Sequence, residues 1–282
     1  MGRIYTVCGL AALTVLASGA ARAEAPKPSA SKMTLAIVLL RDVKLPKAEA
    51  IERAFGAYAL EGQTLRVRPG TKKHGDLEDV ELELDGGTAF VALMPAPVPK
   101  GEADAAARYS ISALNGKWKL PPHKAHLIVT TEGKGDAMTR LAAFTSLLAA
   151  VAEASSAVGV YCGDAGATHD PKFFREIAKD RTTPSRLMLW TGVSIARDGD
   201  HYSLLSLGMK QFELPDLLLV VPPAKADDAL PFMFDLLGMI VAGGKALPEG
   251  DTVGRSATEK LKVHYVTSPV DPKSKVWRVE MK

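Results

Sequence analysis

Two histidines, His123 and His126, lie three residues apart in the stretch KLPPHKAHLIVTT, at the entrance of an apolar run. Two histidines bind one metal ion only when both rings reach the same side. A helical turn would place them so, whereas residues i and i+3 of a strand point to opposite faces. Pro121 and Pro122 before the pair and the β-branched residues after it favour a strand. We therefore predict no metal site, with one histidine buried and hydrogen-bonded and the other at an edge.

Ser206 and Cys162 are the two side chains whose surroundings resemble those of a nucleophile. Ser206, in LLSLG, lacks the first glycine of the GxSxG turn, where Leu204 stands, and leads into no helical pattern. Cys162 closes an apolar run with His169 nearby, but an isolated cysteine in such a place is typical of a small buried hydrophobic residue. The sequence therefore predicts no catalytic residue.

The stretch GMIVAGGK, residues 238–245, has part of a phosphate-binding loop. Met239 and Ala246 stand where that motif needs glycine and then serine or threonine. Moreover, the glycines end an apolar helical run instead of opening a helix, so no helix N-terminus would meet a phosphate. We interpret them as the C-terminal cap of a helix.

Alternating acidic residues occupy one side of the stretch DVELELD, residues 79–85. A row of carboxylates could bind a cation. Arg66 and Arg68 alternate with the same period in the run before it, which predicts two half-buried strands joined by cross-strand ion pairs.

Short apolar runs, helical periodicities and hairpin turns are mixed along the whole chain. We expect strands at residues 33–40, 64–68, 79–85, 88–94, 125–130, 157–162, 187–196, 201–207, 217–221, 261–266 and 276–281, and helices at residues 46–58, 102–114, 136–155, 171–178 and 226–241. This mixture predicts an α+β fold with mixed or antiparallel sheets. Our preferred arrangement has two ferredoxin-like α/β sandwich halves packed together, residues 33–156 and residues 157–282.

The chain begins with a pattern typical of a secretory signal peptide. Arg3 precedes an apolar stretch, and Ala21-Arg22-Ala23 fits a small-x-small cleavage site. We predict a signal peptide at residues 1–23 and a flexible leader at residues 24–32, APKPSASK being rich in proline and serine. The mature protein is then expected in the periplasm or outside the cell.

The charge and composition of the exported protein exclude some classes of partner and some structural features. Loss of Arg3 and Arg22 would lower the formal net charge from +3 to +1, which gives no electrostatic case for nucleic acid or an anionic membrane. Cleavage would also leave one cysteine, so no internal disulfide is possible. No membrane span is expected after cleavage, since the most apolar later stretch, residues 229–241, contains Pro231 and Asp235.

Four stretches carry a resemblance to a known family. They are HKAHLIVT from His123, VGVYCGDAGATHDPKFF from Val158, LLSLGMKQFELPDLLLV from Leu204 and PEGDTVGRSATEKLKV from Pro248. In order and spacing they are similar to an uncharacterised bacterial family, domain of unknown function 4261. The resemblance covers most of the mature chain and is strongest from about residue 157 onward. It implies an α+β fold but no established activity, catalytic residue or cofactor.

Backbone signals are concentrated in the stretch GMKQFELPDLLLV. Gly208 is expected to have a positive φ or to let another backbone approach closely. Pro215 should precede a strand at residues 217–221, whose continuous apolar run predicts cover on both faces. Phe212 is expected to anchor this connection in the core.

The predicted function is that of an exported, non-catalytic binding or protein-interaction module without a cofactor. Its partner is an unknown protein or a small-molecule ligand. Lys210 and Gln211 would lie rigidly beside the anchored connection, and with His126 and Trp190 they are the predicted binding residues. The alternative is an exported hydrolase that uses His126 or His123 with a carboxylate distant in the sequence.

Overall fold

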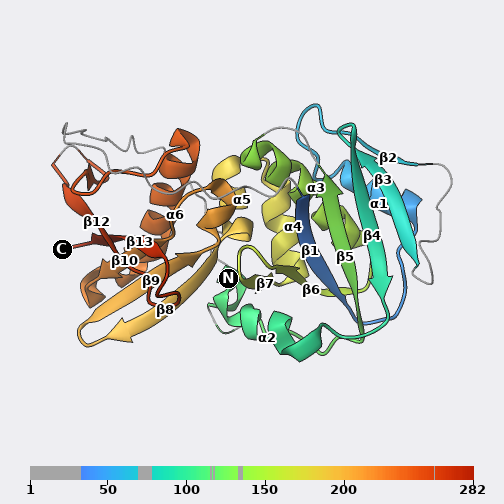
Figure 1. Ribbon diagram of the computed structural model, residues 1–282. Helices are drawn as coiled ribbons and strands as arrows, with labels where there is room; N and C mark the ends of the chain where they lie inside the picture. Colours follow the sequence, from blue (N-terminus) through green and yellow to red (C-terminus); the bar gives the residue numbers. More distant parts are fainter. Residues whose placement is uncertain (1–32, 69–77, 115, 117, 133–135, 257) are drawn as a thin grey trace, which may run out of the picture.

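A computed structural model describes residues 33–68, 78–114, 116, 118–132, 136–256 and 258–282 of the chain. The predicted signal peptide and leader lie outside the described residues. Two sheets stand at opposite ends of the molecule, with helices between them (Figure 1). The α+β class with mixed or antiparallel sheets is therefore confirmed.

The first sheet has seven strands in the order β2-β3-β4-β5-β1-β6-β7. The strands are β1 (Met33–Leu40), β2 (Leu65–Val67), β3 (Asp79–Leu84), β4 (Gly87–Met94), β5 (Ala125–Glu132), β6 (Ala157–Cys162) and β7 (Ala167–His169). Every neighbouring pair is antiparallel. Helix α1 (Ala48–Phe55) follows β1, and α3 (Ala137–Ala154) joins β5 to β6. The central strands β4-β5-β1-β6 with these two helices have the β-α-β-β-α-β connectivity of a ferredoxin-like unit, which β6, from beyond the predicted first half, completes.

The second sheet has six strands in the order β11-β12-β13-β10-β9-β8. The strands are β8 (Gly192–Asp198), β9 (His201–Leu207), β10 (Leu217–Val221), β11 (Thr252–Val253), β12 (Leu261–Thr267) and β13 (Lys275–Glu280). Strand β10 continues into α6 (Ala226–Gly243), and the chain returns so that β13 pairs with β10 in parallel. Neighbouring strands of the ferredoxin-like unit in the first sheet are all antiparallel. The parallel β10–β13 pair therefore contradicts the expectation that the second half repeats this unit. A crossover connection of this kind brings a strand back in the same direction.

The two sheets separate later in the chain than the sequence predicts. Strand β6 pairs with β1, and β7 pairs with β6. The first sheet therefore runs to His169, and the predicted boundary after residue 156 falls before its last two strands. One continuous hydrophobic core includes residues from both halves, among them Val160 of the first sheet and Leu219 of the second.

The remaining helices are α2 (Glu102–Ala106), α4 (Pro171–Lys179) and α5 (Thr183–Trp190). Helix α2 is shorter than the predicted helix at residues 102–114, because separate 3-10 turns follow it. The predicted strand at residues 187–196 is wrong in its first part, since residues 187–190 end α5. A short apolar run does not distinguish helix from strand by its periodicity, and α5 has a proline in its first turn, which favours a helix start.

Helix α3 packs at the centre of the molecule against α1, α4, α5 and the strands β1 and β6 (Figure 1). By length and composition it is the one described helix that could cross a membrane, which the sequence pattern did not single out. Most of it is buried inside the protein, as is typical of a core helix. Asp136 caps it by accepting a hydrogen bond from the Thr139 backbone at 2.8 Å.

Two motif interpretations are confirmed by the fold. Arg66 lies opposite Glu83 in the β2–β3 register, and Arg68 forms ion pairs with Glu81 at 2.7 Å and with Glu83 at 3.8 Å. Glu81 and Glu83 of the acidic row therefore have a cross-strand arginine partner, as the shared period of the two runs predicts. The glycines of GMIVAGGK end α6, where Gly244 has a φ of +60° and donates its N–H to helix carbonyls.

Candidate functional site

His123 and His126 both form hydrogen bonds with the backbone of the connection that follows β4. His126 Nδ1 donates to the Ala96 carbonyl at 2.7 Å, and His123 Nε2 accepts from the Val98 N–H at 3.1 Å. The His126 side chain is only 6 % exposed, and burial lowers its pKa. His126 is thus the buried, hydrogen-bonded histidine that the sequence predicts here. Among the described residues, no group of three or more His, Cys, Asp or Glu side chains is placed to hold a metal ion.

A serine–histidine pair that the sequence did not reveal lies at the junction of the halves. The Ser110 hydroxyl is 2.8 Å from His169 Nδ1, and the other ring nitrogen, Nε2, is 3.1 Å from the Leu189 carbonyl. Both side chains are fully buried, and burial lowers the pKa of His169 to about 4. The hydrogen bonds of the pair connect the 3-10 turn at Ile111–Ala113 to β7 and α5. Because both side chains are buried, a substrate cannot reach the serine–histidine pair.

The other two candidate nucleophiles, Cys162 and Ser206, are also poorly suited to attack a substrate. Burial raises the pKa of the Cys162 thiol to about 12, so the thiolate form is negligible at neutral pH. The buried Ser206 hydroxyl donates to Asp216 at 3.2 Å and accepts from the Leu217 N–H at 2.8 Å. Asp216 in turn accepts from the Met209 N–H at 3.0 Å, and burial raises its pKa to about 6.

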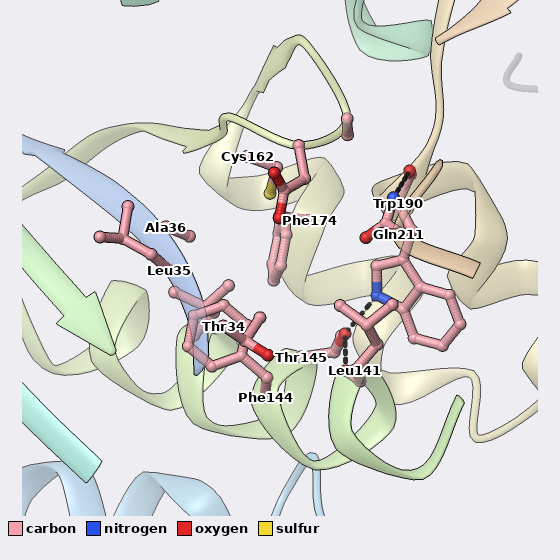
Figure 2. A pocket seen from close by; sticks show the side chains of 13 residues that line it. Thr34, Leu35, Ala36, Leu141, Phe144, Thr145, Cys162, Phe174, Trp190 and Gln211 are labelled. Atoms are coloured by element: carbon pink, nitrogen blue, oxygen red, sulfur yellow. Dashed lines mark hydrogen bonds between the residues drawn. The ribbon is translucent and has the colours of Figure 1, made fainter. Parts of the chain in front are cut away.

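Of the four predicted binding residues, the structure brings Gln211 and Trp190 into direct contact and leaves His126 apart from them. The Gln211 side-chain amide donates to the Trp190 carbonyl at 2.7 Å (Figure 2). It also donates to the Gly208 carbonyl at 2.7 Å, so it holds the connection between β9 and β10 in place. The Trp190 indole N–H donates to the Thr145 hydroxyl at 2.7 Å (Figure 2). Lys210 is exposed, and His126 lies on another sheet. Gln211 and Trp190 therefore lie together, with the exposed Lys210 next to Gln211 in the chain, whereas His126 lies on the other sheet and does not join them.

A small cavity lies beside this connection, lined by Cys162, Gln211, Trp190 and Phe174 among others (Figure 2). Its volume of about 20 Å³ has room for roughly one water molecule. The cavity is too small for an organic ligand in this conformation.

Gly208 meets both expectations placed on it. Its φ is +105°, and a Cβ at this position would lie 2.7 Å from the Ala165 Cα and 2.7 Å from the Asp164 carbonyl oxygen. Pro215 stands two residues before β10, also as predicted. In contrast, β10 alternates between buried and half-buried residues, so the predicted cover on both faces is wrong. Helix α6 packs against β10 and β9, and the alternate residues Leu218 and Val220 remain half-buried.

The Phe212 side chain is half-buried, with its ring 5.8 Å from that of Trp190, and the prediction of a fully buried anchor is too strong. We expect Phe212→Ala to lower the free energy of unfolding by about 1–2 kcal/mol, below the cost of removing a fully buried phenylalanine. Lys210→Ala should leave stability unchanged because the side chain is exposed. Urea denaturation of both variants measures the difference. Equal losses in the two variants would show that the ring contact contributes nothing.

One exposed histidine has a carboxylate partner, as the hydrolase alternative requires, but it is a different histidine from those predicted. His264 Nδ1 lies 2.8 Å from Glu249 Oε1, and the other carboxylate oxygen accepts from the Tyr265 N–H at 2.6 Å. These hydrogen bonds, the one from His264 first, lower the pKa of Glu249. Both side chains are more than half exposed.

The open edges of the two sheets differ in length. In the first sheet the outermost strands, β2 and β7, have three residues each, and in the second β11 has two. Strand β8, at the other edge of the second sheet, has seven residues that pair with β9 in an unbroken register. From Ile195 to Asp198 every residue of β8 is exposed.

Comparison with known proteins locates the family resemblance. The model of the family Domain of unknown function (DUF4261) matches residues 205–280, from within β9 to the end of β13. The suspected resemblance is therefore confirmed over this range, while the stretches quoted from His123 and Val158 lie outside it. No curated protein and no solved structure matches the chain.

Proposed function

We propose that this chain is an exported, non-catalytic protein-interaction module that binds its partner along β8. The observation that carries this proposal is the contrast between β8 and the other sheet edges. Proteins protect open edges by shortening the strand, or by placing lysine, proline or a bulge there. The edges at β2, β7 and β11 are short, whereas β8 has seven residues without lysine, proline or a bulge, and its charged residues, Arg197 and Asp198, stand only at the hairpin end.

Ile195 gives this edge an apolar contact point. Its side chain is 47 % exposed and lies opposite the buried Leu204 in the β8–β9 register. Directly opposite residues share one face of a sheet. Ile195 therefore continues the core side of the second sheet out to its open edge, where a further strand would cover it.

Strand addition is the recognition mode that fits such an edge. The main-chain groups of an added strand supply hydrogen bonds, and alternate side chains supply specificity. Binding of this kind needs no pocket, which agrees with the small size of the cavity near Trp190. The signal-like residues 1–23 support export, and an exported chain would meet partners in the periplasm or outside the cell.

The hydrolase alternative has one observation in its favour, the Glu249–His264 pair. A carboxylate that orients a histidine is part of many acid–base sites. However, both side chains are more than half exposed, and among the described residues the hydrogen bonds of His264 include none to a serine or a cysteine. The open edge at β8 is the stronger basis for a function.

A photo-crosslinking residue placed at position 195 of the exported protein in its native cells tests the proposal. We expect a crosslinked adduct from position 195 because a bound strand covers this side chain. The matched control is position 270, since Val270 is an equally apolar residue with 60 % exposure outside β8. Absence of an adduct at 195, or an equal yield at 270, would overturn binding along β8.

A further inference from the structure

We infer that the partner at this edge is an extended peptide segment that carries a carboxylate two positions away from an apolar side chain. The inference rests on the proposed function and states the chemistry of its partner. Two features of β8 define that chemistry. They are the direction of its free backbone groups and the side chains that share a face with Ile195.

The register of the β8–β9 hairpin decides which backbone groups of β8 are free. A two-residue turn closes the hairpin at Asp198, and the pair that flanks such a turn exchanges backbone hydrogen bonds. Pairs with and without these hydrogen bonds then alternate along the strands. Ala196 and Ser194 therefore bond to β9. The N–H and carbonyl groups of Ile195 and Arg197 point away from β9, toward the open edge.

The start of β8 lies against the first half of the molecule, and its far end does not. The Gly192 N–H donates to the Ala165 carbonyl at 3.0 Å, and the 3-10 turn at Ala107–Tyr109 also contacts β8. The hairpin then extends away from the first sheet (Figure 1), and every residue of β8 from Ile195 onward is exposed. An added strand therefore pairs with this end of β8, where the outward groups are free.

Ile195 and Arg197 also share one face of the sheet. In the hairpin register they lie opposite Leu204 and Tyr202. The Arg197 guanidinium lies 5.8 Å from the centre of the Tyr202 ring, and this cation–π contact holds the charge on the same face as Ile195. Arg197 Nε also donates to the Gly199 carbonyl at 3.4 Å. Arg197 takes part in none of the ion pairs between described residues.

These two side chains set what an added strand must carry. An apolar residue opposite Ile195 covers its exposed surface, and a carboxylate opposite Arg197 forms a cross-strand ion pair, whereas a cation there is repelled. Alternate residues of a strand share a face, so the two positions of the partner are two residues apart. On the other face Ser194 and Ala196 are small and uncharged and place no charge requirement on the partner.

Titration of the isotope-labelled exported chain with the synthetic peptide TVTETVT, followed by NMR, tests this inference. The peptide reads the same in both directions, so it fits a parallel or an antiparallel partner. The amide signals of Ile195 and Arg197 are expected to shift most, because their N–H groups gain acceptors. Those of Ser194 and Ala196, already bonded to β9, should shift less. The matched peptide TVTKTVT should bind about fivefold more weakly.

A charge reversal in the protein tests the same contact from the other side. Arg197→Glu should reverse the preference, so that TVTKTVT binds more tightly than TVTETVT. Lys262→Glu, a charge reversal at an exposed residue of β12, should keep the wild-type preference. The amide spectrum shows whether each variant is folded, and the comparison of the two peptides on the wild type does not depend on any variant. Equal affinity of the wild type for both peptides, or an unreversed preference in folded Arg197→Glu, would overturn the acidic partner.

The crosslinking experiment at position 195 separates this inference from the proposed function. If position 195 crosslinks to a protein in cells but neither peptide shifts the amide signals of Ile195 and Arg197, the inferred partner chemistry is wrong and binding along β8 stands. Absence of any adduct at 195 would overturn both.

Discussion

Arg186→Ala is expected to lower the free energy of unfolding by about 3–5 kcal/mol, the largest effect of any single substitution we propose. Arg186 lies in α5 with 1 % of its surface exposed. Its guanidinium donates to three backbone carbonyls: Ala142 at 2.6 Å, Tyr58 at 2.8 Å and Ala178 at 2.9 Å. These come from α3, the end of the α1 segment and α4, so one side chain joins four helical segments.

The charge of Arg186 persists in the folded protein. Burial is the main reason that its pKa falls, to about 10, which still leaves the guanidinium protonated at neutral pH. Carbonyl oxygens solvate this charge in place of a carboxylate. Truncation would remove these charge-assisted hydrogen bonds and leave a cavity between the helices, and both changes destabilise.

Two variants control for this effect in chemical denaturation. Arg186→Lys keeps the charge but cannot reach three separate carbonyls, so it should lose an intermediate amount of stability. Arg181→Ala removes an exposed arginine five residues earlier and should be nearly silent. A loss below about 1 kcal/mol for Arg186→Ala would mean that the buried guanidinium contributes little net stability.

Local signals in the sequence predicted local features of the structure. Gly208 and Pro215 constrain their own backbone, and both were placed correctly because φ preferences do not depend on distant residues. The ion pairs of Arg68 followed from the shared period of two neighbouring strands. Helix α5 was missed at residues 187–190 because a short apolar run fits either secondary structure.

Features that depend on long-range contacts could not be read from the sequence. Arg186 binds the carbonyls of Tyr58, Ala142 and Ala178, which are far apart in the chain. No local sequence pattern predicts that these three carbonyls lie close together. Strand β8 looks like any hairpin strand until the sheet order places it at an edge. The Ser110–His169 pair likewise joins residues far apart in the chain. The hydrogen bond from the Gln211 amide to the Trp190 carbonyl also joins residues far apart in the chain, so the sequence could not reveal this structural use of Gln211.

Asp216→Asn is expected to make the protein more stable than the wild type at pH 7 and nearly equal to it at pH 4. Burial raises the pKa of Asp216 from 3.8 to about 6, despite hydrogen bonds from Met209 and Ser206 that lower it. The folded state therefore binds the proton more tightly than the unfolded state. The contribution of this group to stability is greatest below pH 4 and falls as the pH rises to about 6.

The size of this change follows from the two pKa values. The difference between 3.8 and about 6 corresponds to a loss of about 3 kcal/mol between pH 4 and pH 7. Asparagine can keep an oxygen acceptor for the Met209 N–H at this position without carrying a charge. The pH dependence that Asp216 contributes should therefore disappear in the Asn variant.

Asp216→Ala separates the charge from the hydrogen bonds. It removes the acceptor of the Met209 N–H and of the Ser206 hydroxyl, and should cost about 1–3 kcal/mol at pH 4, where the wild-type carboxyl is largely protonated. Urea denaturation of the wild type and both variants at pH 4, 5, 6 and 7 measures the two effects together. Parallel pH profiles for the wild type and Asp216→Asn would show that the carboxyl titrates at an ordinary pKa, so that it must reach water in the folded state. The turn that Asp216 holds would then be more open to solvent than its contacts with Met209 and Ser206 indicate.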